Sequence, residues 1–244
     1  MYIAFSQLKH FSIHATDGDI GACKDALFDD QDLVIRYFYV DTSAWLPLSR
    51  KVIITPISVT GIEHDKKAMA VAMDTETLKA SPSIDTHKPV SREYEEALFK
   101  YLGYGYYWTG PGAWGDFAMP NQLVDEPVRE DLTELEKTES NNHLRSCDEV
   151  DGYDVNLTGH RHGHICDFIF NTKTWAIELF IVDTNNWLPG GKKLAVSPKQ
   201  LEKIDWPSQQ VSLKISDGVL MQAPEVDLDK VSDSQYIEGI LSKM

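Results

Sequence analysis

The stretch Val-Asp-Thr-Ser-Ala-Trp-Leu-Pro at residues 40–47 occurs a second time, as Val-Asp-Thr-Asn-Asn-Trp-Leu-Pro at residues 182–189. The two stretches are 142 residues apart, and the same offset aligns the sequence on either side of them without a gap. Residues 1–85 and 143–227 are therefore two copies of one unit, here called the first and second copy. Identical pairs outside the quoted stretch include Gly21 with Gly163, Asp25 with Asp167, Phe28 with Phe170, Ile35 with Ile177, Phe38 with Phe180, Lys51 with Lys193, Pro56 with Pro198 and Pro82 with Pro224.

Each copy is predicted to consist mainly of short strands. Residues 33–40 and 175–182 are rich in β-branched and aromatic side chains and follow turn residues, which is typical of central strands. Residues 211–215 alternate between apolar and polar side chains, and the equivalent residues 68–73 are apolar throughout. Closely spaced strands with no long helical pattern between them favour two tandem small, partly open antiparallel β-barrels.

A short helix is predicted after each copy. Ser91 precedes an apolar stripe with a spacing of three and four, and Gly103 is placed to end the helix. Ser232 and Gln235 form a capping-box pattern ahead of a second apolar stripe. The predicted organisation is a first unit over residues 1–115, an acidic linker over residues 116–142 with a short helix at 128–137, and a second unit over residues 143–244.

In these motifs the chain resembles the PRC-barrel family. The family is named for the photosynthetic reaction centre, in which one subunit has a barrel of this kind as its cytoplasmic domain. The resemblance rests on the glycine-bearing turn, the Val-Asp-Thr-x-x-Trp-Leu-Pro stretch, the Lys-x-x-x-x-Pro element and the late proline in both copies, and on residues 90–95 with the aromatic residues after them. It covers about 170 of 244 residues. The resemblance implies a six-stranded, partly open antiparallel barrel in each copy and a role as an assembly or docking module. It names no specific partner, because the chain lacks the membrane helix of the reaction-centre protein and the basic surface and companion domain of a ribosome-maturation relative.

Charge and composition exclude several classes of protein. The 38 acidic residues outnumber the 23 lysines and arginines, which gives a formal net charge of -15 and argues against nucleic acid as a partner. No apolar run reaches membrane-spanning length and residues 1–10 lack the features of a signal peptide, so a cytoplasmic location without membrane insertion is expected. The cysteines Cys23, Cys147 and Cys166 are expected to be reduced thiols.

One group of residues could bind a metal ion. His160, His162 and His164 alternate, so on a strand their imidazoles would share one face and could hold zinc, copper or nickel. The alternative is a polar turn, which Gly159 and Gly163 favour. The first copy has Gly18, Ile20 and Ala22 at the equivalent positions, so the fold itself needs no metal, and no cofactor is predicted.

Other candidate residues each have a functional and a packing interpretation. Asp41 and Asp183 could act as paired carboxylates or accept hydrogen bonds in a turn. Trp45 and Trp187 could be hot spots for a partner or could pack over the end of a barrel. Cys23 and Cys166 are interpreted as buried packing residues.

An aromatic segment at residues 104–114 also allows two interpretations. It could stack a ring-shaped ligand, or it could pack onto an apolar surface of the protein itself, which is the preferred interpretation. Its aromatic residues are Tyr104, Tyr106, Tyr107, Trp108 and Trp114.

The central strands are apolar on both faces, so something is expected to cover each face. The alternating set that includes Leu33, Ile35 and Tyr37, with its second-copy equivalents, is assigned to the barrel interior. The opposite face carries one charge per copy, Arg36 or Glu178. We predict either that the two copies pack face to face with these two residues as an ion pair, within one chain or in a homodimer, or that the helices cover this face.

Three functions are weighed. The first is a non-enzymatic protein-binding or assembly module of unassigned pathway and unknown partner. The alternative is a small-molecule or metal-binding protein that uses the three histidines or residues 104–114. The third is a hydrolytic enzyme, which is disfavoured because the sequence has no nucleophile elbow, phosphate loop or zinc-protease helix.

Overall fold

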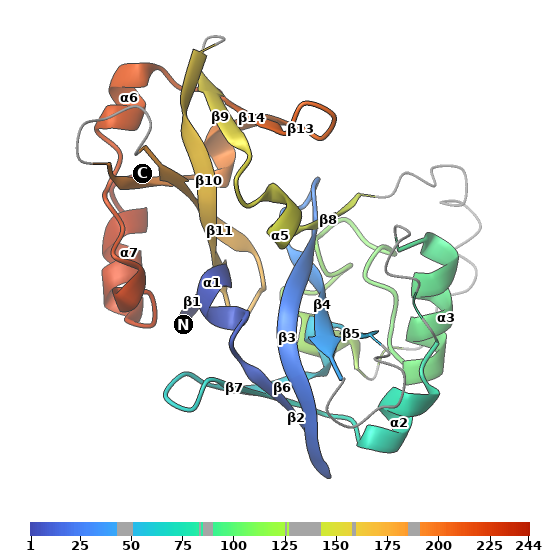
Figure 1. The fold of residues 1–244 in the computed structure, drawn as a ribbon. Helices are drawn as coiled ribbons and strands as arrows, with labels where there is room; N and C mark the ends of the chain where they lie inside the picture. Colours follow the sequence, from blue (N-terminus) through green and yellow to red (C-terminus); the bar gives the residue numbers. More distant parts are fainter. Residues whose placement is uncertain are drawn as a thin grey trace. The chain divides into compact units, whose positions relative to one another are not determined.

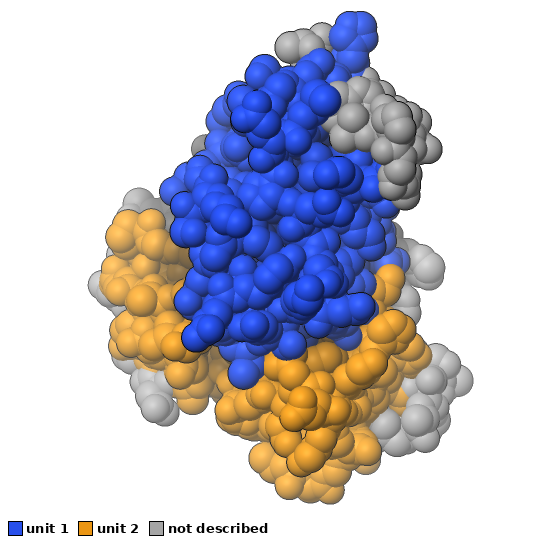
Figure 2. Space-filling view, turned by 90° about the vertical axis from the view of Figure 1, so that its left-hand side faces the viewer, with its two compact units in different colours: residues 1–7, 146–172, 176–244 blue, residues 8–145, 173–175 orange. Residues whose placement is uncertain are grey.

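The chain is mainly β and divides into two compact units (Figure 1, Figure 2). The computed structural model describes residues 1–42, 51–82, 84, 90–124, 126, 143–157, 160–184 and 191–244. Unit 1 consists of residues 1–7, 146–172 and 176–244, and unit 2 of residues 8–145 and 173–175. Unit 1 is therefore built mainly from the second copy and unit 2 mainly from the first.

Unit 2 contains a seven-stranded sheet in the order β5-β4-β3-β2-β7-β6, with β8 paired to β3. Its strands are β2 (Ser12–Ala15), β3 (Gly18–Asp29), β4 (Ile35–Asp41), β5 (Lys51–Ile54), β6 (Val59–Glu63), β7 (Ala68–Val71) and β8 (Leu144–Ser146). The pair β2–β7 is parallel, whereas β2–β3, β3–β4, β4–β5 and β6–β7 are antiparallel. The sheet is not closed, which agrees with the predicted partly open barrel, but the parallel pair shows that the all-antiparallel prediction is wrong at that point.

Unit 1 contains a sheet of the same topology, in the order β12-β11-β10-β9-β14-β13, with β1 paired to β10. Its strands are β1 (Tyr2–Ala4), β9 (Asp154–Leu157), β10 (His160–Asn171), β11 (Ile177–Asp183), β12 (Lys193–Val196), β13 (Leu201–Asp205) and β14 (Gln210–Leu213). The parallel pair recurs here as β9–β14.

The two central strands, β4 and β11, each begin two residues later than the sequence predicts, because Leu33 and Trp175 lie in turns with φ of 53° and 57°.

The structure confirms the internal repeat element by element. Each strand of the second copy begins and ends 142 residues after its counterpart; β4 starts at Ile35 and β11 at Ile177, for example. Unusual backbone angles repeat at the same offset: φ is 128° at Gly21 and 129° at Gly163. A Cβ atom on Gly21 would lie 1.8 Å from the carbonyl oxygen of Asp41, so the bulge of β3 opposite β2 requires glycine.

The two copies exchange their first strands. Strand β1 belongs to the first copy by sequence, yet it pairs with β10 inside unit 1, with Tyr2 opposite Asn171 and Ala4 opposite Ile169. Its counterpart β8 belongs to the second copy and pairs with β3 inside unit 2. Each unit is therefore completed by a strand from the other copy, so a division of the chain at residues 116–142 separates both units from their seventh strand.

Helices follow the strands at equivalent positions in both copies. They are α1 (Phe5–Leu8), α2 (Thr75–Ala80), α3 (Arg92–Leu102), α5 (Cys147–Val150), α6 (Asp217–Met221) and α7 (Ser234–Leu241), with 3₁₀ turns η1 (Pro56–Ser58), η2 (Pro120–Leu123), η3 (Pro198–Gln200) and η4 (Leu228–Lys230). Ser91 caps α3 and Gly103 ends it with φ of 73°, as predicted. The prediction for α7 is wrong by one residue, because Asp233 rather than Ser232 supplies the cap. The predicted helix at 128–137 lies outside the described residues.

The cores show which face of each central strand the helix covers. In unit 1, Leu179 and Ile181 of β11 join Ile237 and Ile240 of α7 in one buried cluster. In unit 2, the ring of Tyr37 on β4 contacts that of Phe99 on α3, with centroids 6.4 Å apart. In each unit, therefore, the helix after the copy (α3 or α7) packs on the face of the central strand (β4 or β11) that is predicted from the sequence to line the barrel interior. Within the described part of the chain, no helix combines the length and the apolar character that crossing a membrane requires.

Candidate functional site

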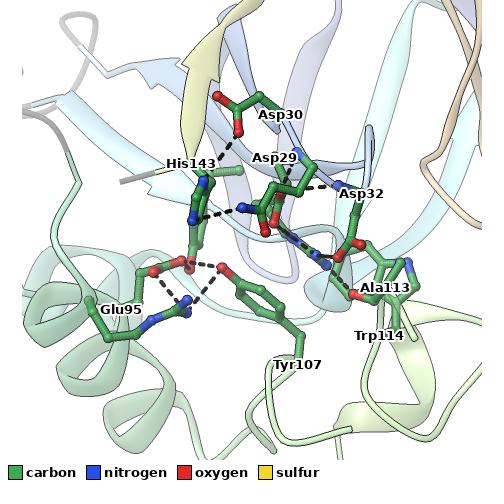
Figure 3. A network of polar contacts seen from close by, with 12 residues as sticks. Asp29, Asp30, Asp32, Glu95, Tyr107, Ala113, Trp114 and His143 are labelled. Carbon is green, nitrogen blue, oxygen red and sulfur yellow. Dashed lines mark hydrogen bonds and ion pairs between the residues drawn. The ribbon is translucent and has the colours of Figure 1, made fainter. Parts of the chain in front are cut away.

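A buried polar network in unit 2 surrounds the carboxylate of Glu95 on α3 (Figure 3). Glu95 interrupts the apolar stripe of the helix and is only 3% exposed. One carboxylate oxygen, Oε1, accepts hydrogen bonds from the hydroxyl of Tyr37 at 2.8 Å and from that of Tyr107 at 2.7 Å. The other, Oε2, lies 3.1 Å from Nη1 of Arg92. The network therefore fastens α3 to strand β4 and to the aromatic segment.

Arg36 on β4 forms the second centre of this network. Its Nη2 atom lies 3.1 Å from Asp29 and 2.6 Å from Asp32, and its Nη1 atom donates to the carbonyl of Ala113. The guanidinium carbon lies 3.8 Å from the ring centre of Tyr107 and 4.9 Å from that of Trp114. Because the acids of the turn before β4 and the aromatic rings surround it, Arg36 is almost completely buried.

The predicted ion pair between Arg36 and Glu178 is wrong. Each residue has its partners within its own unit, since Glu178 accepts a 3.0 Å hydrogen bond from Asn171. Asn171 is the repeat equivalent of Asp29, so the same two positions are hydrogen-bonded in both copies. The donor and the acceptor are exchanged: Arg36 donates to Asp29, whereas Glu178 accepts from Asn171. In unit 2 the charge of Arg36 is balanced by Asp29 and Asp32, whereas in unit 1 Glu178 is hydrogen-bonded to the neutral amide of Asn171.

Burial controls the protonation of the network. Desolvation raises the pKa of the Glu95 carboxyl, and Arg92 and the two tyrosines offset only part of that effect. Burial, followed by the nearby Glu95 charge, also raises the pKa of Tyr37 well above its usual value. These groups have perturbed acidity, but their hydrogen bonds are already made and their side chains are buried. The arrangement can hold elements together and offers no free acid or base to a substrate.

The aromatic segment 104–114 packs into unit 2, in agreement with the preferred interpretation. All five aromatic side chains are buried, and the rings of Tyr106 and Trp108 stack with centroids 4.6 Å apart. The indole of Trp114 donates a 2.8 Å hydrogen bond to the carbonyl of Thr174. A cavity of about 180 Å³ lies beside the segment, lined by residues that include Gly105 and Phe117. This volume is below the roughly 300 Å³ from which small-molecule pockets usually begin.

The three candidate histidines lie in a strand and not in the predicted turn, because β10 begins at His160. His162 is 3% exposed; its Nδ1 donates to the carbonyl of His160 at 2.7 Å, and its Nε2 lies 3.1 Å from a carboxylate oxygen of Asp217. His160 is exposed and His164 half-buried. A bulge at Gly163 interrupts the alternation that would place the three imidazoles on one face. Among the described residues, no three histidine, cysteine or acidic side chains are placed to bind one metal ion.

The remaining candidates have structural surroundings. Asp41 and Asp183 end their strands and each lies opposite a lysine of the next strand in its own sheet. Burial raises the pKa of the Cys23 and Cys166 thiols to about 12, which makes them poor nucleophiles. Cys23 is buried, as predicted, and Cys166 is half-buried. Trp45 and Trp187 lie outside the described residues.

An open groove in unit 1 was not predicted from the sequence. It lies between the end of α6 and the outer part of α7 and has a volume of about 550 Å³. Val219 and Met221 of α6 are 48% and 54% exposed, which is unusual for large apolar side chains. The signal was present in the sequence, because the repeat offset places Lys243 at the position of Tyr101 and Gly239 at that of Ala97. The groove is lined by Gln222, Pro224, Glu225, Gln235, Tyr236, Gly239, Ile240 and Lys243.

Comparison with known proteins does not assign a family. A scan against models of protein families finds no match to this chain, and a search of curated proteins finds no significant match. The likeness to PRC-barrels therefore remains a prediction from the repeat motifs.

Proposed function

We propose that this chain is a non-enzymatic protein-binding or assembly module of the PRC-barrel type. The observation that carries the proposal is the open groove of unit 1, together with the exposed apolar side chains Val219 and Met221 on α6, the helix that ends directly before the groove residue Gln222. Exposed apolar side chains that border a concave, polar-rimmed surface are typical of contact sites for other proteins. The residues identical in both copies include Gly, Pro, Asp, Trp, Phe and Ile, which are types that set turns and fill cores.

The state of the ionisable groups supports a binding role over catalysis. The acids with raised pKa values, Glu95 and Asp167, are buried and hydrogen-bonded within their units. Catalytic acids and bases must reach a substrate proton, directly or through one water molecule. Neither carboxyl group is exposed for that purpose, since Glu95 is 3% and Asp167 1% exposed.

The test is stoichiometric reconstitution with a captured partner. Tagged chain is used to recover proteins from a native lysate, and the recovered protein is then purified and mixed with the chain in size-exclusion chromatography. The proposal predicts a complex with fixed stoichiometry. If no recovered protein forms such a complex, the binding role is wrong.

The metal-binding alternative has its own measurement. Isothermal titration with zinc, nickel and copper is carried out on the wild type and on the variant His160→Ala/His162→Ala/His164→Ala. A saturable heat that is present in the wild type and lost in the variant would favour metal binding instead. We expect no such difference, because both ring nitrogens of His162 already have partners.

A further inference from the structure

The helices after the two copies pack differently on the preceding short helix. In unit 2, the hydroxyl of Tyr101 at the end of α3 donates a 3.0 Å hydrogen bond to the carbonyl of Thr77 in α2. The hydroxyl of Tyr94 on the same helix donates to the carbonyl of Pro82 at 3.1 Å. The space between α2 and α3 is therefore bridged by tyrosine side chains from α3 itself.

The equivalent space in unit 1, beside α6 and α7 (Figure 1), is an open groove. Lys243, just after α7, replaces Tyr101, and Gly239 on α7 replaces Ala97, so this segment has neither the ring nor the methyl group that α3 presents. A Cβ atom built on Gly239 would meet no atom within 4 Å. Tyr236, the equivalent of Tyr94, accepts a 2.7 Å hydrogen bond from the backbone N–H of Asp227. In unit 2 the Tyr101 side chain bridges α3 and α2, and in unit 1 the groove lies at the equivalent place, where Lys243 provides no such ring.

The charges at the groove indicate what a partner would bring. Glu225 is paired with Lys192 at 3.3 Å, whereas Lys243 has no ion-pair partner among the described residues. An aromatic ring that enters the groove would take the place of the Tyr101 side chain in unit 2, which bridges to α2 while remaining 41% exposed. A carboxylate next to that ring would neutralise the ammonium group of Lys243.

We infer that the groove between α6 and α7 binds an acidic segment of a partner protein through one inserted aromatic side chain, with a carboxylate of that segment paired to Lys243. The inference rests on the proposed protein-binding function and names its surface and the chemistry of its partner. The first copy supplies the comparison, because there the chain itself provides the ring.

The experiment is an NMR titration of the ¹⁵N-labelled chain, residues 1–244, with three capped peptides. The acidic aromatic peptide is Ac-Glu-Gly-Tyr-Gly-Glu-NH₂, the basic one is Ac-Lys-Gly-Tyr-Gly-Lys-NH₂, and the peptide without a ring is Ac-Glu-Gly-Ala-Gly-Glu-NH₂. We expect saturable shifts of the Gln222, Gly239 and Lys243 amides with the first peptide and none with the third. The basic peptide is expected to bind about 2- to 5-fold more weakly, which is the range of one exposed ion pair.

Two variants sharpen the result. Lys243→Tyr inserts the residue of the first copy and should fill the groove and abolish the shifts, while the control Lys199→Tyr on η3 should leave them unchanged. Lys243→Glu should make the basic peptide the better ligand, and this reversal does not depend on whether the tyrosine variant packs well.

Several results would overturn the inference. They are equal or tighter binding of the basic peptide, shifts with the alanine peptide of the same size, shifts centred elsewhere, or no saturable shift with any peptide. The proposed function fails separately: if a reconstituted partner complex survives Lys243→Tyr unchanged, the chain binds proteins, but not through this groove.

Discussion

Units 1 and 2 share a backbone plan but stabilise their helices by different chemistry. In unit 2 the contact between strand β4 and helix α3 is made by Tyr37 and Glu95. At the equivalent positions of unit 1, Leu179 and Ile237 make it with apolar side chains alone. One fold therefore accepts either a hydrogen-bonded carboxylate or a hydrocarbon contact at the same place. The comparison shows that the fold does not require the polar network of unit 2. The contribution of that network to the free energy of unfolding can therefore be measured by replacing its residues with their unit 1 equivalents.

The largest expected effect comes from removing the Glu95 carboxylate. Glu95→Leu leaves two buried tyrosine hydroxyls and Arg92 without their acceptor, so the free energy of unfolding should fall by about 3 to 5 kcal/mol. Urea denaturation followed by tryptophan fluorescence measures the change. Glu93→Leu in the exposed first turn of the same helix serves as the control and should lower stability by no more than about 1 kcal/mol, because it removes only the hydrogen bonds of a carboxylate at the helix N-terminus. Equal effects of the two substitutions would contradict the role assigned to the network.

The same comparison offers a rescue. A variant with Tyr37→Leu, Arg92→Ser and Glu95→Ile carries the unit 1 residues, and Tyr107→Phe removes the remaining hydroxyl donor. Replacing a complete buried polar cluster by apolar groups is often close to neutral, so this variant should be at least about 2 kcal/mol more stable than Glu95→Leu. A rescue variant as unstable as the single substitution would mean that the two units are not interchangeable at this contact.

A smaller effect is expected at the glycines that the units share. Gly21→Ala and Gly163→Ala force a side chain onto a backbone with φ near 128°, where the new Cβ would lie 1.8 Å from the Asp41 carbonyl oxygen and 2.3 Å from that of Asp183, respectively. Each substitution should cost about 1 to 3 kcal/mol, with Gly21→Ala the more damaging. Thermal unfolding of both variants checks the order. Gly61→Ala, whose Cβ would meet no atom within 4 Å, is the control.

The smallest effect is the pH dependence that Glu95 contributes. Its pKa is raised in the folded protein, so its contribution to stability is complete below the unfolded pKa of about 4.3 and is lost as pH rises through the folded value. Relative to Glu95→Gln, the wild type should therefore lose stability as pH rises above the unfolded pKa of about 4.3, and the loss should end once pH has passed the folded pKa. Paired urea titrations at several pH values measure the difference, in which the other titrating groups cancel. A constant difference across this range would contradict the assignment.

Much of the fold could be predicted because its signals are local. The β-branched and aromatic residues that follow turn residues located the strands β4 and β11, and Ser91 and Gly103 marked the ends of α3. The exchanged strands could not be predicted, since Tyr2–Ala4 and Leu144–Ser146 occupy equivalent places in two near-identical sheets. Sequence similarity between copies cannot tell which sheet a short strand joins.

The site was harder to predict because its partners come from separate elements. The charge of Arg36 stands out in the sequence, but its actual partners, Asp29 and Asp32, lie on the adjacent turn and have the pattern of ordinary turn residues. The groove follows from the absence of a ring at position 243 and of a methyl group at position 239, and such absences leave no chemically active residue to mark the place.

The exchanged strands also set the order in which the two units can be completed during synthesis. Strand β1 is made before its partner β10, which begins only at His160, so Tyr2 and Ile3 have no sheet to join until the more than 150 residues between them have been made. The sheet around β3 must likewise wait for β8 at Leu144. All of unit 2 has been made once residues 173–175 are added, whereas unit 1 still lacks β11 to β14 at that point, so unit 2 can be completed before unit 1.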